Sequence, residues 1–168
     1  MPEFDVVSLP DHDAPSVGDT APDFTRPLVN AEFWEDAALS DLTDDGPVLL
    51  VFHTMAGAFP ATYVWNELRD CGVPDEVQTV GVSISSPYEH KSLLAERGVD
   101  ARLFSDPAAG VAADYDLEHD LDGMAGVTEH RPAVFLLDEE RTVQYRWVAA
   151  EWPDFPDYEG IADALDDL

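Results

Sequence analysis

Three kinds of side chain in this sequence have the chemistry of a reactive or binding site: a thiol, imidazoles and a guanidinium. Cys71 is the one cysteine, so a disulfide or a dithiol exchange within one chain is excluded. It follows Asp70, and a neighbouring carboxylate raises the pKa of a thiol. His53 follows an apolar run, whereas His130 and Arg131 directly precede another one. These residue types allow thiol chemistry or the binding of a small anion.

The candidate ligand-binding residues form one set: His53, Thr54, His130 and Arg131. Imidazole, hydroxyl and guanidinium groups together suit an anion or a small metabolite, and imidazoles with carboxylates suit a metal ion. The acidic neighbours of His119 and His130 are adjacent to them, without the four-residue spacing that places two ligands on one helix face. We therefore expect no metal site and no cofactor.

A strand, a loop and a helix must position these groups. The apolar run Pro47–Phe52 predicts a buried strand that ends at His53. A helix is expected over Pro60–Asp70, where apolar residues such as Trp65 recur at helical spacing. Cys71 lies at the far end of this helix, where the negative end of the macrodipole also raises a thiol pKa.

The other segments alternate between the two patterns. Strands are expected at Asp23–Leu28, Ala38–Leu42 and Gln78–Ser85, and a hairpin at Ala133–Leu137 and Thr142–Ala149. Helices are expected from the capping box Ser86-Pro87-Tyr88-Glu89 to Arg97, from Asp106-Pro107 through Tyr115, and over Tyr158–Leu168. His90, between two charged residues, is expected on a solvated helix face. The sequence thus predicts an α/β sandwich with a mixed sheet, residues 17–168, after an N-terminal arm of residues 1–16.

The charge of the chain is extreme. It holds 36 acidic side chains against 8 basic ones and has a formal net charge of −28. The acids recur along the whole chain, and this pattern is typical of proteins that work in concentrated salt, which screens their self-repulsion. Nucleic-acid binding is not expected because no basic patch exists to neutralise phosphates. No apolar run approaches the length of a membrane span, and the first residues lack a basic start, so we expect a cytoplasmic protein with no membrane association.

Several segments resemble one family. The stretch Val17-Gly18-Asp19-Thr20-Ala21-Pro22-Asp23-Phe24, the strand Pro47–Phe52 and the stretch Phe104-Ser105-Asp106-Pro107 are similar to peroxiredoxins of the alkyl hydroperoxide reductase and thiol-specific antioxidant type, also called redoxins. This resemblance implies a thioredoxin-like three-layer sandwich, with a central mixed β-sheet flanked by helices. It also implies an antioxidant peroxidase, an oxidoreductase that works through a reactive cysteine.

The catalytic residues of that family are missing. Its motif P-x-x-x-T-x-x-C would place proline at Thr54, threonine at Ala58 and cysteine at Ala61, and its arginine falls on Pro132. Such chemistry needs a thiolate at a helix N-terminus, and alanine provides no nucleophile. The segment from Pro132 is instead similar to one in thioredoxin-like reductases that begins with a cis proline, so a cis Arg131–Pro132 peptide is expected.

Three functional hypotheses remain. The first is a non-catalytic, peroxiredoxin-like protein with a binding or oligomer role; Met55 and Phe59 would then belong to a homodimer interface, because many relatives dimerise near this loop. The second is an antioxidant oxidoreductase that acts through Cys71. The third is a small-anion or metal-binding module at His53, His130 and Arg131. No ligand or partner protein follows from the residues.

Overall fold

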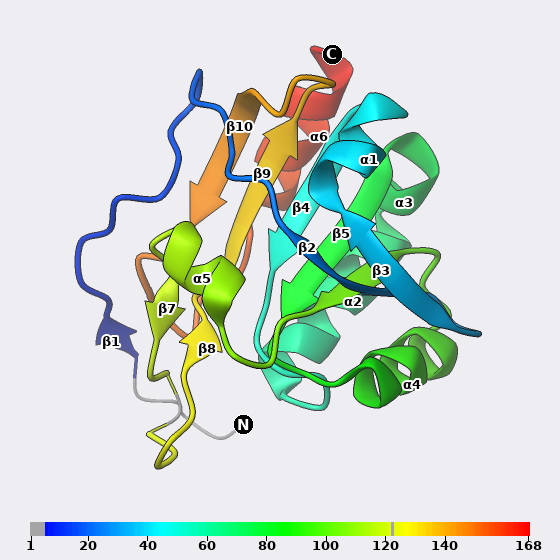
Figure 1. The fold of residues 1–168 in the computed structure, drawn as a ribbon. Coiled ribbons are helices and arrows are strands. Elements are labelled where there is room, and N and C mark those ends of the chain that lie inside the picture. Colours follow the sequence, from blue (N-terminus) through cyan, green and yellow to red (C-terminus); the bar gives the residue numbers. More distant parts are fainter. Residues whose placement is uncertain (1–5, 122) are drawn as a thin grey trace.

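A computed structural model describes residues 6–121 and 123–168 of the chain. Its centre is a seven-stranded sheet in the order β10-β9-β4-β5-β6-β2-β3 (Figure 1). The strands are β2 Thr25–Val29, β3 Trp34–Ala38, β4 Val48–Phe52, β5 Gln78–Ser83, β6 Arg102–Ser105, β9 Ala133–Leu137 and β10 Val143–Val148. Strands β4, β5 and β6 are parallel and the other pairings are antiparallel, so the sheet is mixed as expected.

Six helices and two small sheets complete the described part of the chain. The helices are α1 Leu39–Asp44, α2 Phe59–Asp70, α3 Val73–Glu76, α4 Pro87–Arg97, α5 Gly110–Asp114 and α6 Tyr158–Asp166. The small sheets pair β1 Val7–Ser8 with β11 Glu151–Trp152, and β7 Glu118–His119 with β8 Glu129–His130. Within the described residues, no helix combines the length and the apolar character needed to cross a bilayer.

Strand β4 lies in the middle of two hydrophobic cores. All five of its side chains are buried; those of Val48, Leu50 and Phe52 belong to the core that α1 and α5 cover. The two alternate side chains, Leu49 and Val51, face the core formed with α2, α4 and α6. Helices on both faces explain why this strand is apolar throughout rather than alternating.

The structure confirms two elements that local sequence signals predicted: the capped helix α4 and the hairpin of β9 and β10. Ser86 caps α4 by accepting a hydrogen bond from the Glu89 amide at 3.3 Å, and the Glu89 carboxylate accepts one from the Ser86 amide at 3.3 Å. Gly98 ends this helix in the left-handed conformation, with φ of 60°. Strands β9 and β10 form the expected antiparallel hairpin.

The strand expected at Ala38–Leu42 is wrong. Strand β3 ends at Ala38, and α1 begins at the next residue. A carboxylate oxygen of Asp23 accepts the Ser40 amide at 2.9 Å, and that of Asp41 accepts the Ala38 amide at 3.3 Å. These bonds satisfy free amides of the first helical turn, so the segment coils instead of extending.

The cis peptide expected at Arg131–Pro132 is also wrong: among the described residues, the cis peptide is Trp152–Pro153. The Arg131 amide donates to the Leu117 carbonyl at 2.7 Å, and the Pro132 carbonyl accepts the Ala149 amide at 2.9 Å. The chain therefore passes from β8 into β9 as extended, paired backbone.

Candidate functional site

The start of α2 is where the resemblance would place a reactive cysteine. Ala58 occupies the N-cap position and offers no side-chain hydrogen bond to the helix. Ala61 is fully buried in the first turn, and Thr54 and Pro132 are buried as well. Position 61 therefore has neither a reactive group nor contact with solvent.

Cys71, the one thiol, lies at the opposite end of α2. It is exposed, forms the C-cap of the helix, and its Sγ lies 3.6 Å from a carboxylate oxygen of Glu67. Partial burial, the Glu67 carboxylate and the charge of Asp70 together raise the pKa of this thiol. Because the thiolate is the nucleophile, this environment disfavours peroxide chemistry.

A group of polar side chains is buried beneath the loops at the ends of β4, β5, β6 and β8. We call it the buried polar cluster, and it consists of His53, Ser83, Ser85, His90, Ser105, Asp106 and His130. Buried polar groups are costly unless they are hydrogen-bonded, so the partners of each member decide what the cluster does.

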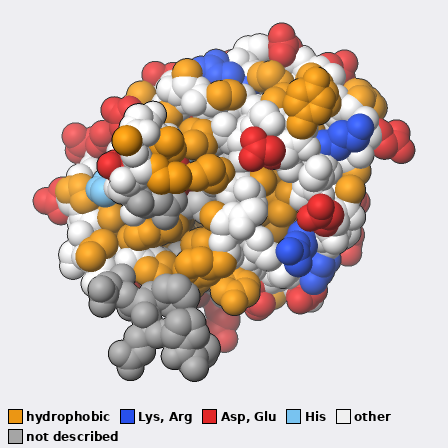
Figure 2. Space-filling view, turned by 90° about the horizontal axis from the view of Figure 1, so that it is seen from below, with side chains coloured by type: hydrophobic (Ala, Val, Ile, Leu, Met, Phe, Trp, Pro, Cys, Tyr) orange, Lys and Arg blue, Asp and Glu red, His pale blue; other side chains and the backbone are white. Residues whose placement is uncertain are grey.

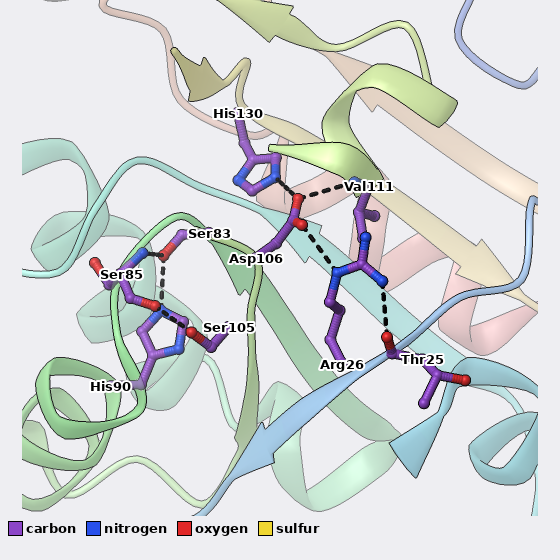
Figure 3. Close-up of polar contacts among 9 residues, drawn as sticks. All are labelled: Thr25, Arg26, Ser83, Ser85, His90, Ser105, Asp106, Val111 and His130. Carbon is purple, nitrogen blue, oxygen red and sulfur yellow. Dashed lines mark hydrogen bonds and ion pairs between the residues drawn. The ribbon is translucent and has the colours of Figure 1, made fainter. Parts of the chain in front are cut away.

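Asp106 is the anionic centre of this cluster. Its carboxylate accepts hydrogen bonds from Arg26 Nε at 3.1 Å, His130 Nε2 at 2.8 Å and the Val111 amide at 2.9 Å (Figure 3). Burial alone would raise the pKa of Asp106, but the bonds from His130, Arg26 and Val111 outweigh it and hold the pKa below its usual range. The predicted helix after Asp106 is present, although only as the short α5.

A chain of serine contacts forms the other half of the cluster. Ser83 Oγ accepts the Ser85 amide at 3.2 Å and lies 2.7 Å from His90 Nε2, and Ser105 Oγ donates to the Ser85 carbonyl at 2.6 Å (Figure 3). Ser85 Oγ in turn accepts the Ala56 amide at 2.7 Å, which fixes the loop after β4. Burial lowers the pKa of His90 to about 3, so its imidazole is neutral.

His53 is a neutral packing residue in this structure. Its Nδ1 donates to the Thr54 carbonyl at 2.7 Å, and its ring meets Trp65 edge to face, with the centroids 5.4 Å apart. Its Nε2 faces Gly81, where an added Cβ would lie only 2.8 Å away. Burial lowers the pKa of His53 well below its usual value, and its Nε2 is buried without a hydrogen-bond partner among the described residues.

The residues proposed as one ligand site are divided by the structure. His53 and His130 both join the buried polar cluster, and a Coulombic contribution from His130 adds to the lowering of the His53 pKa. Arg131 turns away from them and donates to the carbonyls of Pro10 and Ala149 at 2.7 and 2.8 Å. Within the described residues, no group of three or more His, Cys, Asp or Glu side chains has the arrangement of a metal site.

Five members of the cluster were not among the candidate site residues: Ser83, Ser85, His90, Ser105 and Asp106. His90 is fully buried, contrary to the expectation of a solvated position. The sequence did contain a signal for the burial of His90. This residue shares one helical face with Leu93 and Leu94, and both leucines are core residues. The binding of Asp106 to Arg26 joins residues 80 positions apart, and no local pattern predicts it.

A mixed sheet with helices on both faces, and a central strand that leads through a short loop into a buried helix start, defines a thioredoxin-like fold of the peroxiredoxin type. The sequence model of the AhpC/TSA family matches residues 17–146. The chain therefore belongs to the AhpC/TSA family, as the resemblance of its segments indicated. Among curated proteins, no sequence matches it significantly.

Solved structures share this fold over nearly the whole chain. The peroxidoxin BcpB of Mycobacterium tuberculosis is 25% identical, with a TM-score of 0.70 over 89% of this chain and 94% of that one. A thiol peroxidase from Chromobacterium violaceum is 24% identical, with a TM-score of 0.74 over 93% and 89%. AhpC of Enterococcus faecalis is 14% identical, with a TM-score of 0.73 over 90% of each chain.

Proposed function

We propose that this chain is a peroxiredoxin-fold protein that lacks thiol-peroxidase chemistry and works through binding and self-association. The observation that carries the proposal is Ala61: it occupies the first turn of α2, is fully buried, and provides no nucleophile. The scaffold around this position is retained, because β4, the loop and α2 keep their places in the fold.

The remaining thiol does not replace the missing one. A peroxide-reducing cysteine needs a lowered pKa, which a helix N-terminus or a nearby cation provides. Cys71 has the opposite surroundings, with the helix C-terminus and the carboxylates of Glu67 and Asp70 around it. An exposed thiol of this kind reacts with peroxide as an ordinary cysteine does.

Peroxide consumption tests this proposal. Wild type and Cys71→Ser are compared in concentrated KCl with hydrogen peroxide and dithiothreitol as the electron donor. We expect equal rates, no higher than the background reaction of dithiothreitol with peroxide. Turnover by the wild type that disappears in Cys71→Ser would contradict the proposal and favour an antioxidant enzyme that acts through Cys71.

An exposed aromatic surface supports the self-association. Phe59, Tyr63 and Phe155 are 38%, 58% and 37% exposed. Their rings form a continuous row, with centroid distances of 5.8 and 6.1 Å. We call this row the aromatic surface; contiguous exposed apolar groups are a common mark of interaction sites.

A second copy of the chain is the occupant that we propose for the aromatic surface. Figure 2 shows the end of the molecule where β4 leads into α2, with hydrophobic side chains gathered from the left to the centre, a few Asp, Glu, Lys and Arg side chains to the right of the centre, and the other acidic side chains around the edge. With a net charge of −28, two copies repel each other least over a face that is poor in carboxylates.

Sedimentation in concentrated KCl measures this association. We expect a dimer for the wild type and a monomer for Tyr63→Asp, because the new carboxylate cannot be buried against a second copy. Phe33→Asp is the matched control, since Phe33 is 53% exposed at the turn between β2 and β3 and has no place in the aromatic surface. A monomeric wild type, or equal dissociation of both variants, would contradict the homodimer.

A further inference from the structure

The N-terminal arm and β10 enclose an open cavity of about 500 Å³ that neither the family resemblance nor the proposed function uses. The arm runs along this edge of the sheet, outside β10 (Figure 1). Its charged and polar lining includes His12, Arg131 and Arg146 together with Asp11 and Asp13. We call it the arm cavity.

Arg131 is a fixed cation of the arm cavity. Its side chain is only 5% exposed, and its guanidinium donates from Nε to Ala149 and from Nη1 to Pro10. Both acceptors are neutral carbonyls, and no carboxylate of the described residues lies within ion-pair distance. Because a guanidinium has five N–H groups, these two bonds fix its orientation and leave donors available.

Arg146 is a second cation held in the same way. Its Nη1 donates to the carbonyls of Ala14 and Pro15 at 2.8 and 3.0 Å and to Ser16 Oγ at 3.3 Å. Its position on β10 therefore places a further guanidinium against the arm, again with neutral partners. Two oriented cations at one cavity are notable in a chain with only eight basic side chains.

His12 adds a neutral donor to these two cations. Its Nδ1 accepts the Ala14 amide at 3.1 Å, so in the neutral ring the proton is on Nε2. Burial and, after it, the positive charges of Arg131 and Arg146 lower the pKa of His12.

We propose that the arm cavity binds a small oxyanion of the phosphate class, either free or as a phosphate monoester. Guanidinium groups match the oxygens of phosphate with paired N–H donors, and an imidazole N–H adds a third contact. The bound anion would join the arm to β10, because its ligands come from both.

The carboxylates that border the cavity lower its affinity for an anion, but in the part of the chain that the structure describes they form no ion pairs with the guanidinium groups of Arg131 and Arg146. Asp11 and Asp13 are exposed, and the carboxylate of Asp116 accepts the Asp13 amide at 2.6 Å. Their charges are screened in concentrated salt, whereas the buried Arg131 is screened much less. Because the repulsion that remains at short distance still opposes an anion, removal of one carboxylate, as in Asp11→Asn, should tighten anion binding.

Inorganic phosphate is the probe for the first test, with thermal unfolding and titration followed at constant ionic strength in KCl. We expect phosphate to raise the melting temperature of the wild type above that of the KCl-matched sample, because it binds only the folded state. Arg146→Gln should weaken the apparent affinity about tenfold or more, which is the loss of one charged hydrogen bond. A phosphate monoester titrated in parallel distinguishes the two forms of the ligand.

Arg141→Gln is the matched control. Arg141 Nε donates to the Ala21 carbonyl at 3.3 Å, so this change also removes one positive charge and one carbonyl contact, but outside the arm cavity. Its phosphate response should remain that of the wild type, and that of Asp11→Asn should be stronger. Equal weakening in Arg141→Gln and Arg146→Gln, or no phosphate effect beyond KCl, would overturn the proposal.

The histidine signals of the wild-type protein give a second readout that requires no variant. Phosphate should shift the imidazole resonances of His12 and raise its pKa, while the buried His53 and His90 serve as internal references. A His12 signal that phosphate leaves unchanged would also overturn the proposal. The peroxide assay does not depend on this result, so the two proposals can fail separately.

Discussion

At the scale of single residues, Ala61 and Cys71 lie at opposite ends of α2. The end that would activate a thiolate carries the alanine, and the end that disfavours a thiolate carries the thiol. The helix start provides the dipole and the amides that activate a thiolate, but its residue is alanine. The thiol lies at the other end of the same helix, beside carboxylates that raise its pKa. The same helix would favour a nucleophile at one end and disfavours it at the other.

The burial of position 61 leads to a first prediction. In a Cys71→Ser background, Ala61→Cys should react with a bulky aromatic disulfide reagent far more slowly than Cys71 does in the wild type, because Ala61 is fully buried whereas Cys71 is exposed. Absorbance of the released thiolate measures both rates, and a sample unfolded in urea gives the labelling rate of the fully exposed thiol. Equally fast labelling of the folded variant and of Cys71 would show that the helix start is open.

The neutral histidines predict how stability depends on pH. The folded pKa values of His53 and His90 lie below the unfolded value of 6.5. The unfolded chain therefore binds protons first, so their contribution is present above about pH 6.5 and is lost as the pH falls below it. Urea unfolding in concentrated KCl should show lower midpoints at about pH 5 than at about pH 7.

The variant His90→Gln separates the histidine contribution to the pH dependence of stability from the contribution of the many carboxylates. The variant retains a polar group for Ser83 but has no imidazole, so its stability should fall less between about pH 7 and about pH 5 than that of the wild type. An identical pH dependence of the two proteins would contradict the assignment of His90 as a neutral buried group.

At the scale of elements, α4 shows how a local signal sets a boundary. Ser86 exchanges hydrogen bonds with Glu89, and Gly98 ends the helix. Ser86→Ala should lower the free energy of unfolding by about 1 kcal/mol, the usual cost of losing an N-cap. Ser92→Ala, at an exposed position within the same helix, should be neutral or slightly stabilising. Chemical denaturation measures both, and equal effects would show that the cap has no special role.

The elements that the sequence predicted are those with local causes. The apolar run of β4 and the capping box of α4 are complete within a few residues. Strand β1 was missed for two reasons. Its partner β11 lies at the other end of the chain, and a strand of two residues is too short to show an alternating pattern of apolar and polar side chains. Helix α1 was missed, and a strand predicted in its place, because a carboxylate from Asp23 helps to set where the helix begins.

The candidate site was predictable only in part for the same reason. That position 61 is an alanine can be seen in the sequence, and His53 and His130 were selected from their places beside strands. The orientation of Arg131 was not predictable, because its guanidinium donates to the carbonyls of Ala149 and Pro10, and Pro10 belongs to an arm more than a hundred residues away in the sequence. The phosphate site that we propose there could not be predicted before the arm was located.

At the scale of the whole molecule, the basic side chains act mainly as supports for the backbone. Arg131, Arg141 and Arg146 donate to main-chain carbonyls, whereas the arginine–carboxylate pairs of the described residues are those of Arg26 and Arg69. Most of the 36 acidic groups therefore have no cation to offset their charge, and their repulsion opposes the compact state.

This imbalance predicts a strong dependence of stability on salt. The screening length falls from roughly 10 Å at 0.1 M salt to roughly 3 Å at 1 M, so KCl should raise the melting temperature steeply over this range. Calorimetry at increasing KCl measures the effect, and sucrose serves as a control for general exclusion from the surface. A melting temperature independent of KCl would contradict the view that charge repulsion limits this fold.

The central claim is that no thiol of this chain has peroxidatic reactivity, and the oxidation rate of Cys71 by hydrogen peroxide tests it most directly. Mass spectrometry of the intact protein in concentrated KCl follows the added oxygen on Cys71, with free cysteine as the reference at the same pH. The raised pKa of the thiol predicts a rate equal to or slower than that of free cysteine. A rate orders of magnitude faster than free cysteine would contradict the loss of catalysis and make Cys71 a relocated active-site residue.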